Sequence, residues 1–238
     1  MRYPIKTLAA AAAAGAVALS LGAAAQAATI FSATIEEDQS TTPSPGFTNQ
    51  FGQASLALNE DGNGGFTLSM SIDFSGDFDF SEIIASGQID TVNGTNTATG
   101  PLVTGFHIHN AARGQTGGVV FSIFDTRIAA LGGSNDTDGD NTLTFNADGS
   151  ATLVSEWDFQ EGTGNGLLAD FVTELSLAMM GDDIALYFNL HTAEAASGLI
   201  RGQIVAENNA VPVPAALPLF ATALLGGGYL RRRKQAKA

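Results

Sequence analysis

The strongest pattern in the chain is the run Phe66-Thr67-Leu68-Ser69-Met70-Ser71-Ile72-Asp73-Phe74, in which apolar and polar residues alternate. Successive side chains of a β-strand point to opposite faces, so this run predicts a strand with one buried and one solvated face. Residues 59–65 before it are rich in Asn, Asp and Gly, and residues 54–58 form another apolar run. Two runs joined by a turn of this composition predict a β-hairpin.

Similar strand signals continue on both sides of this hairpin. The other expected strands are residues 29–35, 88–92, 104–109, 119–123, 142–146, 151–157, 185–191 and 199–206. Residues 166–180 instead place their apolar side chains at helical spacing. About ten strands and one short helix predict an all-β fold, an antiparallel, Greek-key-like β-sandwich.

Composition limits the classes of function. Residues 28–210 hold all 24 acidic residues of the chain and only three arginines, so their formal charge is −21, against −14 for the whole chain. Such a surface repels nucleic acid, whose phosphates require Lys and Arg. The chain has no cysteine, which excludes disulfides, zinc–thiolate sites and cysteine nucleophiles.

The first 27 residues have the three parts of a secretory signal peptide. Arg2 and Lys6 form a positive segment, an alanine-rich apolar segment follows, and Ala25 and Ala27 frame a small-x-small cleavage site. We expect signal peptidase to cut after Ala27 and the mature chain to be exported across the inner membrane. The alternative is an N-terminal anchor that stays attached.

The C-terminal end has a different character. A linker and motif at residues 208–215 contains Val211, Pro212, Val213, Pro214 and Ala215, and its prolines predict an extended chain. The apolar run 216–230 predicts a helix within residues 216–238. This run is shorter than the ~20 residues that a helix needs to span a bilayer. The longer segment that begins at Val211 and ends at residue 230 just reaches that length. The basic residues 231–234 belong on the cytoplasmic side, which leaves the acidic domain outside.

This order of proline motif, apolar run and arginine cluster resembles the PEP-CTERM class of sorting signals. The letters VPVPAALPLF resemble the VPLPA variant, with Val213 in place of the usual leucine. The resemblance implies that an exosortase-type membrane peptidase processes the tail at or near the motif and that the domain then reaches the cell surface or the exterior. A plain single-span anchor is the alternative.

All three histidines of the chain lie on expected strands. His107 and His109 are two residues apart and therefore share a face, while Phe106 and Ile108 point to the core. His191 ends a similar strand. Three imidazoles from neighbouring strands can bind Cu(II) or Zn(II). The alternative is a cluster whose hydrogen bonds hold one end of the sandwich together.

The same stretches carry a second resemblance. The first stretch is Phe106-His107-Ile108-His109-Asn110-Ala111-Ala112-Arg113-Gly114. The second stretch is Phe188-Asn189-Leu190-His191-Thr192-Ala193, followed by residues 198–204. Both resemble hallmarks of the CHRD domain, and we expect that domain to occupy residues 28–207. The resemblance implies a β-sandwich with a structural or binding role and with no established catalytic activity.

The strand with its two histidines also resembles copper/zinc superoxide dismutase, a Greek-key β-barrel. That enzyme requires four copper histidines, a separate zinc site and a disulfide, which three histidines without cysteine cannot supply. The resemblance therefore implies a superoxide-dismutase-like barrel as an alternative fold, and we assign no catalytic residue.

Asp136, Asp138 and Asp140 alternate in a glycine-containing loop, as oxygen ligands of a calcium loop do. The EF-hand pattern fails, because Ala147 stands where it requires Glu, and a solvated acidic turn is the alternative. Taken together, the sequence predicts an exported β-sandwich that serves as a structural or binding module of the envelope or matrix. Its expected partner is a matrix polysaccharide or an envelope protein. The alternative is a small metal-binding protein or metalloenzyme.

Overall fold

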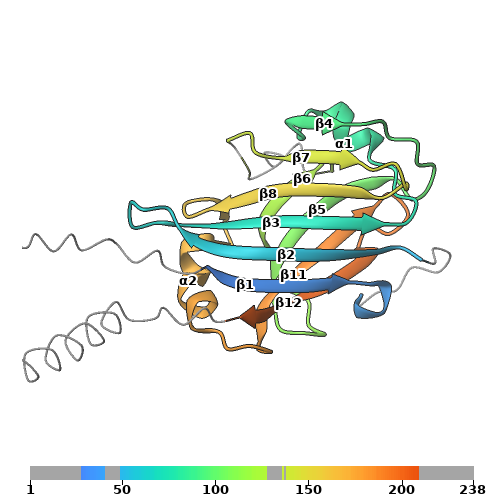
Figure 1. Ribbon diagram of the computed structural model, residues 1–238. Helices are drawn as coiled ribbons and strands as arrows, with labels where there is room; N and C mark the ends of the chain where they lie inside the picture. The colour runs from blue at the N-terminus through green and yellow to red at the C-terminus, as the bar shows by residue number, and fades with distance from the viewer. Residues whose placement is uncertain (1–27, 41–48, 128–135, 137, 209–238) are drawn as a thin grey trace, which may run out of the picture. The chain divides into compact units, whose positions relative to one another are not determined.

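The computed structural model describes residues 28–40, 49–127, 136 and 138–208 (Figure 1). These residues belong to one compact unit, Gln26–Pro214. The expected signal peptide, the proline motif and the apolar tail lie outside the described residues. Within the described part of the chain, no helix is long and apolar enough to cross a membrane.

Strands make up about half of the described residues, and the strands expected from the sequence are present, although the one expected at residues 88–92 is shorter and shifted to Thr91–Asn93. The main strands are β1 (Thr29–Ile35), β2 (Phe51–Glu60), β3 (Phe66–Ser75), β4 (Thr91–Asn93), β5 (Val103–Asn110), β6 (Gly118–Asp125), β7 (Thr142–Phe145), β8 (Ala151–Asp158), β11 (Asp183–Thr192) and β12 (Ile200–Asn208). The short strands β9 (Gly162–Thr163) and β10 (Gly166–Leu167) pair with each other. The helical segments are the 3-10 turn η1 (Glu37–Gln39), α1 (Ser81–Ser86) and α2 (Leu168–Leu177).

Ten strands form one continuous sheet in the order β4-β7-β8-β3-β2-β1-β12-β11-β5-β6. Neighbouring strands are antiparallel except for the parallel pair β4 and β7. The sheet curls, so that the half containing β8, β3, β2 and β1 faces the half containing β12, β11, β5 and β6 (Figure 1). The predicted all-β antiparallel fold is therefore confirmed, and its two layers are the two halves of a single sheet.

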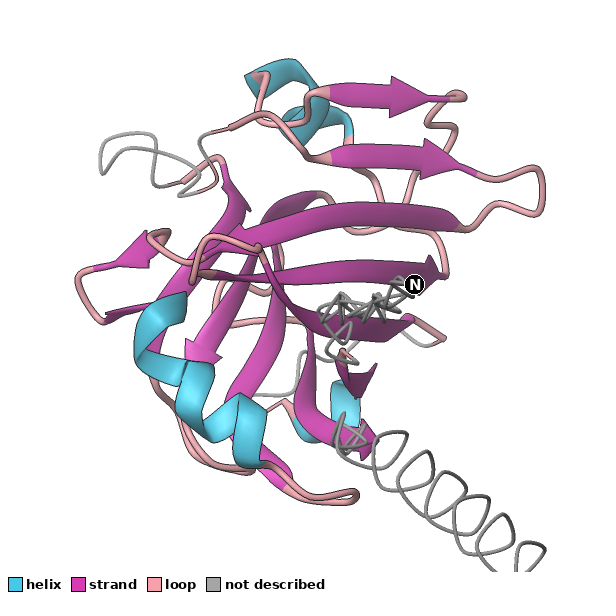
Figure 2. Cartoon of the chain, turned by 60° about the vertical axis from the view of Figure 1, so that its left-hand side comes forward, coloured by secondary structure: helices cyan, strands magenta, loops and turns pink. Residues whose placement is uncertain are grey.

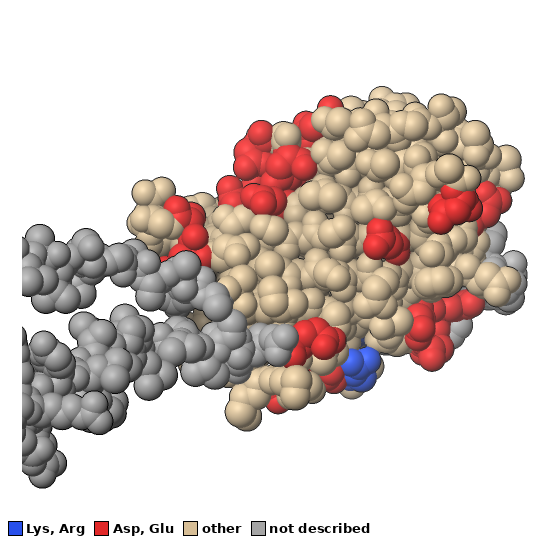
Figure 3. Space-filling view, in the orientation of Figure 1, with Lys and Arg blue, Asp and Glu red and all other residues tan. Residues whose placement is uncertain are grey.

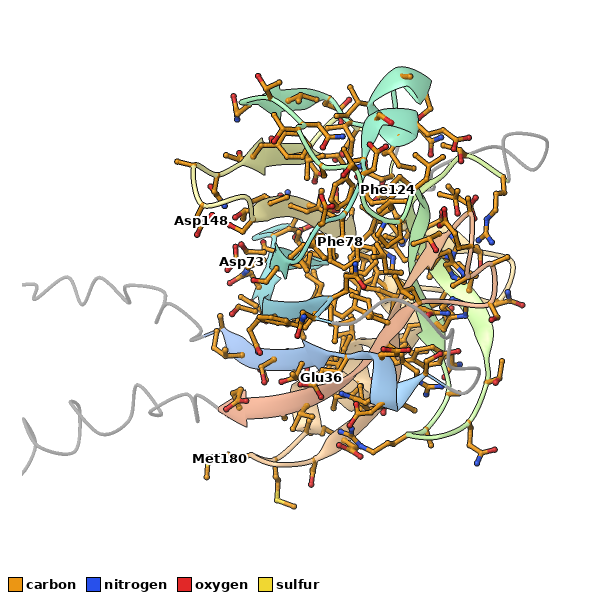
Figure 4. The ribbon with its side chains drawn as sticks, turned by 90° about the vertical axis from the view of Figure 1, so that its right-hand side faces the viewer. Glu36, Asp73, Phe78, Phe124, Asp148 and Met180 are labelled. Atoms are coloured by element: carbon orange, nitrogen blue, oxygen red, sulfur yellow. The ribbon has the colours of Figure 1, made fainter. Side chains whose placement is uncertain are left out.

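Aromatic side chains join the two halves. The alternation predicted for residues 66–74 is confirmed, because Leu68, Ile72 and Phe74 of β3 are fully buried. The Phe74 ring lies 5.3 Å from the ring of Phe106 on β5, which belongs to the facing half. Figure 4 places Phe78 and Phe124 between the halves and Asp73 and Asp148 on the outside. Burying each large apolar side chain contributes about 1.5–3 kcal/mol.

The helices depart in part from the prediction. The segment expected at residues 166–180 is helical only over α2, which lies against one end of the curled sheet (Figure 2). The backbone N–H of Leu167 bonds the Asp170 carboxylate at its start, and the chain turns extended at Ala178. The structure also contains the helix α1, which was not predicted from the sequence. Its six residues are too few to show a helical period in the sequence.

The surface of the unit is acidic. In Figure 3, Asp and Glu side chains form several patches on the face shown, whereas Lys and Arg appear at one place. Among the described residues the fixed positive charges are Arg113, Arg127 and Arg201, and Arg201 is buried. The described surface therefore offers nucleic acid no basic patch.

A candidate metal centre at three histidines

The pairing of β5 with β11 brings the three histidines together. His109 lies opposite Tyr187 in this register, and His191 lies opposite Gly105, diagonal to His107. His107 and His109 share the face away from the core, as predicted, because Phe106 and Ile108 between them are fully buried in it. The placement of His191 on the neighbouring strand is also confirmed.

The imidazole rings converge to within metal-binding reach. The ring of His107 lies 4.8 Å from that of His191 and 5.7 Å from that of His109, measured between centroids. One ligand nitrogen from each ring lies within 4.8 Å of the other two. Three nitrogens around a tetrahedral zinc ion, with bonds of about 2.0–2.1 Å, lie about 3.4 Å apart, so small ring movements would complete such a site.

Each ring is held from behind by an oxygen atom. His109 Nδ1 lies 3.0 Å from the carbonyl oxygen of Gly117, and His191 Nδ1 lies 2.9 Å from that of Ala196. His107 Nε2 lies 2.8 Å from the carboxylate of Asp125. Because the two carbonyl oxygens accept hydrogen bonds, the Nδ1 atoms of His109 and His191 carry the protons. The lone pairs of these two rings are therefore on Nε2, and the ring nitrogens that face no carbonyl oxygen are left without a partner of this kind.

Those remaining nitrogens are buried and have no hydrogen-bond partner among the described residues. They are Nε2 of His109, Nε2 of His191 and both ring nitrogens of His107, of which Nε2 is the one beside the Asp125 carboxylate. The three residues, His107, His109 and His191, are 1%, 8% and 6% exposed. Buried polar atoms in proteins are nearly always paired, so unpaired nitrogens on three rings in one place require an explanation. Histidines that bind metal typically donate their other N–H to a carbonyl or a carboxylate, as His109 and His191 do.

The protonation of the cluster favours ligation. Burial lowers the pKa of His109 to about 4, and the neighbouring His107 and Arg201 charges act in the same direction. Burial likewise lowers the pKa of His191 to about 3, with contributions from His107 and Arg127. Both rings are therefore neutral at physiological pH. A neutral imidazole is the form that binds a metal ion.

Asp125, at the end of β6, completes the cluster and was not predicted from the sequence. Its side chain is fully buried. Burial alone would raise its pKa, but the hydrogen bond from His107 and the Arg127 contacts lower it to about 2. Gly105 leaves room for this pair, because a Cβ at that position would lie 3.1 Å from Asp125 Cγ and 3.2 Å from His107 Nε2, tighter than ordinary van der Waals contact. Since Asp125 is far from His107 in sequence, no local spacing signals the pair.

A stack of side chains forms one wall of the cluster. The Tyr187 ring lies 4.9 Å from the ring of His109 and nearly parallel to it. The Arg201 guanidinium lies over the same Tyr187 ring, 3.5 Å from its centre. Arg201 also donates to the carbonyl oxygens of Gln115 and Ala112. It therefore holds the loop between β5 and β6, which carries Gly117, against the cluster.

The predicted calcium loop is only partly assembled as expected. Asp136 and Asp138 gather with Glu161, which the sequence did not indicate, and one carboxylate oxygen of each lies within 4.8 Å of the others. Asp140 lies outside that group, and its carboxylate accepts the backbone N–H of Glu156. Burial and the neighbouring carboxylates raise the pKa of Asp136 to about 8. Calcium binding at this cluster stays a prediction.

The fold and the cluster together define a class: a β-sandwich domain with a buried group of histidines on the outer face of two adjacent strands. Comparison of the sequence with protein families identifies the family. The family model of the CHRD domain matches residues 31–204, and the chain belongs to this family. No curated protein and no solved structure matches the chain.

Proposed function

We propose that this CHRD-family chain is an exported β-sandwich module that binds a transition metal ion, Zn(II) or Cu(II), through His107, His109 and His191. One observation carries the proposal: three buried imidazoles each offer a nitrogen within 4.8 Å of the other two, and every ring has a nitrogen without a hydrogen-bond partner among the described residues. Each of the three rings is held from behind by a carbonyl or carboxylate oxygen.

The donor set favours these two metals. Imidazole suits zinc and copper, whereas calcium and magnesium prefer oxygen ligands. Three imidazole nitrogens leave one coordination position for water or another ligand. The Asp125 carboxylate behind His107 would offset part of the charge of a bound divalent ion, although it does not itself join the ligand group.

The surroundings favour binding over catalysis. The rings are almost fully buried, and the loop held by Arg201 and the turn that carries Ala196 both contact them. We assign no acid, base or nucleophile next to the cluster. In this proposal the ion joins the two loops to the sheet and stabilises a module of the envelope or the extracellular matrix, with a matrix polysaccharide or an envelope protein as its partner.

The location is proposed from the sequence. The signal peptide ending at Ala27 supports export, and the motif at residues 211–215 with its apolar run and arginines supports anchoring followed by processing. The domain would then be held outside the inner membrane until an exosortase-type peptidase releases it to the cell surface.

Metal analysis of the purified mature protein tests the proposal. Elemental analysis should find close to one zinc or copper ion per chain, and dialysis against a chelator should remove it and lower the melting temperature. His109→Ala and His191→Ala should each abolish binding. Tyr187→Phe is the matched control: it alters the same wall and removes the hydroxyl that bonds the Gly117 N–H, but leaves every ligand nitrogen in place.

The alternative gives a different result. If the histidines only hold the sandwich together, His109→Ala would lower the melting temperature while the metal content of the native protein was already negligible. Added zinc or copper would then shift the melting temperatures of the native chain and of His109→Ala equally. That outcome would rule out the metal site.

A further inference from the structure

We propose that the end of the domain formed by Leu177, Met179 and Met180, here called the α2 tip, rests on a lipid bilayer with zwitterionic headgroups. This inference depends on the anchoring proposed above for the C-terminal segment. It adds a second contact, made by the folded domain itself, which would orient the domain on the membrane.

The α2 tip is the most exposed group of large apolar side chains in the described part of the chain. Leu177 is 73% exposed, Met179 65% and Met180 74%, whereas the other exposed large apolar residues do not exceed 47%. Single exposed apolar side chains are common, but a contiguous group of them marks a surface that contacts something.

Packing of the folded domain does not require apolar side chains at the α2 tip. The helix α2 buries Leu168, Phe171 and Leu175 against the core, and Leu177 lies at its end on another side. Beyond the helix, the turn is held by the Met179 N–H, which bonds the Asp182 carboxylate. Its shape therefore depends on backbone and acidic groups, and polar residues would serve equally well at positions 177, 179 and 180.

The position of the α2 tip identifies what it contacts. The turn after Met180 is bonded to the end of β12, because the Gly181 N–H donates to Ala206 O at 2.7 Å and the Ala206 N–H donates to Asp182 O at 3.0 Å. Strand β12 ends at Asn208, which pairs with Ile30 at the start of β1. Both ends of the folded chain therefore leave the sheet beside the α2 tip (Figures 1 and 4).

The length of the following chain limits how far this end can lie from a membrane. Seven residues, and therefore eight Cα–Cα steps, separate Asn208 from the apolar run that starts at Ala216. Even fully extended, they reach only about 26–29 Å. A domain anchored by that run is therefore held close to the bilayer by the end that carries its most exposed apolar side chains. The opposite end, with the turn between β7 and β8, faces away.

The acidic side chains near the α2 tip indicate which lipid headgroups it can approach. Glu174, Asp182 and Asp183 line a shallow pocket together with Leu177 of the α2 tip, and Asp183 is paired with Arg113. These carboxylates would be repelled by anionic headgroups but not by zwitterionic ones. Leucine and flexible methionine side chains can enter the boundary between headgroups and acyl chains, which is where apolar groups of peripheral surfaces bind.

Because the chain has no cysteine, a single introduced cysteine can be labelled specifically to test the proposal. The full chain with Met180→Cys, labelled with a polarity-sensitive fluorophore, is reconstituted through its tail into nanodiscs of zwitterionic lipid. The emission should shift to the blue, and a quencher attached to the lipid acyl chains should reduce it severalfold. The matched control is Asp148→Cys, an exposed position in the turn between β7 and β8, which should show neither effect.

Three outcomes would overturn the proposal. A probe at position 180 as exposed to water as the one at position 148, on chains that co-purify with nanodiscs, would refute docking and leave anchoring intact. Failure of the chain to co-purify with nanodiscs would refute the anchoring on which docking rests. A blue shift that rises with protein concentration in the absence of lipid would assign the surface to a second copy of the chain.

A second measurement does not depend on the label. Hydrogen exchange of the backbone amides of residues 177–181 should be slower in nanodiscs than in detergent solution. In the triple variant Leu177→Ser/Met179→Ser/Met180→Ser the difference should vanish, while the tail still holds the chain in the nanodisc. Because all three side chains are exposed, the substitutions should leave the fold unchanged, and unchanged exchange in β3 would show this.

Discussion

At the scale of single residues, the histidine cluster depends on groups that are not histidines. Gly105 provides the space in which His107 and Asp125 meet, and the carbonyl oxygens of Gly117 and Ala196 determine which nitrogens of His109 and His191 remain free. A cluster with the same three histidines but other surroundings would lack the alignment of lone pairs. The residues behind the ligands are therefore the most informative to change.

Asp125→Asn should weaken metal binding without removing a ligand. The amide is the same size as the carboxylate but lacks its charge, so it holds the His107 ring less firmly and offsets less of the charge on the ion. Loss of such a partner typically costs 10–100-fold in metal affinity, which competition titration with a chromogenic chelator would measure. Asp183→Asn, the same change at an exposed position, is the control and should leave the affinity unaltered.

At the scale of elements, β12 controls the loop between β5 and β6. Arg201 donates to two carbonyl oxygens of that loop, and Gln203 donates to the Ala111 carbonyl oxygen. The loop contributes Gly117 behind His109 but no ligand. Its attachment should therefore affect how long an ion stays bound more than how many ions bind.

Arg201→Lys should accelerate metal release. Lysine keeps the positive charge but cannot bond two carbonyl oxygens with a planar fork, so the loop opens more often. We expect a severalfold faster loss of metal to excess chelator in a stopped-flow experiment, with one ion still bound at equilibrium. A release rate equal to that of the native chain would contradict this role for Arg201.

The acidic cluster formed by the segment between β6 and β7 and the turn after β8 allows a separate prediction about calcium. If Asp136, Asp138 and Glu161 bind it, millimolar CaCl₂ should raise the melting temperature relative to EDTA, because a ligand that binds only the folded state stabilises that state. An equal rise with MgCl₂, or one that survives in Asp136→Asn/Asp138→Asn, would indicate general screening of charge instead. Differential scanning calorimetry would distinguish these outcomes.

At the scale of the whole molecule, the predicted tail governs where the acidic domain resides. Deleting residues 211–238 should release the domain as a soluble exported protein, because the apolar run and its arginines are then missing. Pro212→Ala/Pro214→Ala should leave the chain bound to the membrane and unprocessed. Fractionation with mass spectrometry of the mature C-terminus measures both effects. A native protein that still ends at Ala238 would refute the sorting signal and leave a simple anchor.

Local pattern was sufficient to predict most of the fold. Alternation over residues 66–74 and in the other runs identified the strands, because the side chains of a strand alternate between a buried and a solvated face wherever one face is covered. The spacing of His107 and His109 predicted their shared face for the same reason. The helix α1 escaped detection, since six residues are too few to display a helical period.

Contacts between distant parts of the chain determined the rest. The pairing of β5 with β11 places His191 beside His107, although 84 positions separate them in sequence, and the pairing of β5 with β6 brings Asp125 behind His107. Glu161 joins Asp136 and Asp138 in the same way. The order of strands and the curling of the sheet follow from burying apolar faces that no single segment can cover alone. Local composition therefore predicts which residues can act, while long-range packing decides which of them meet.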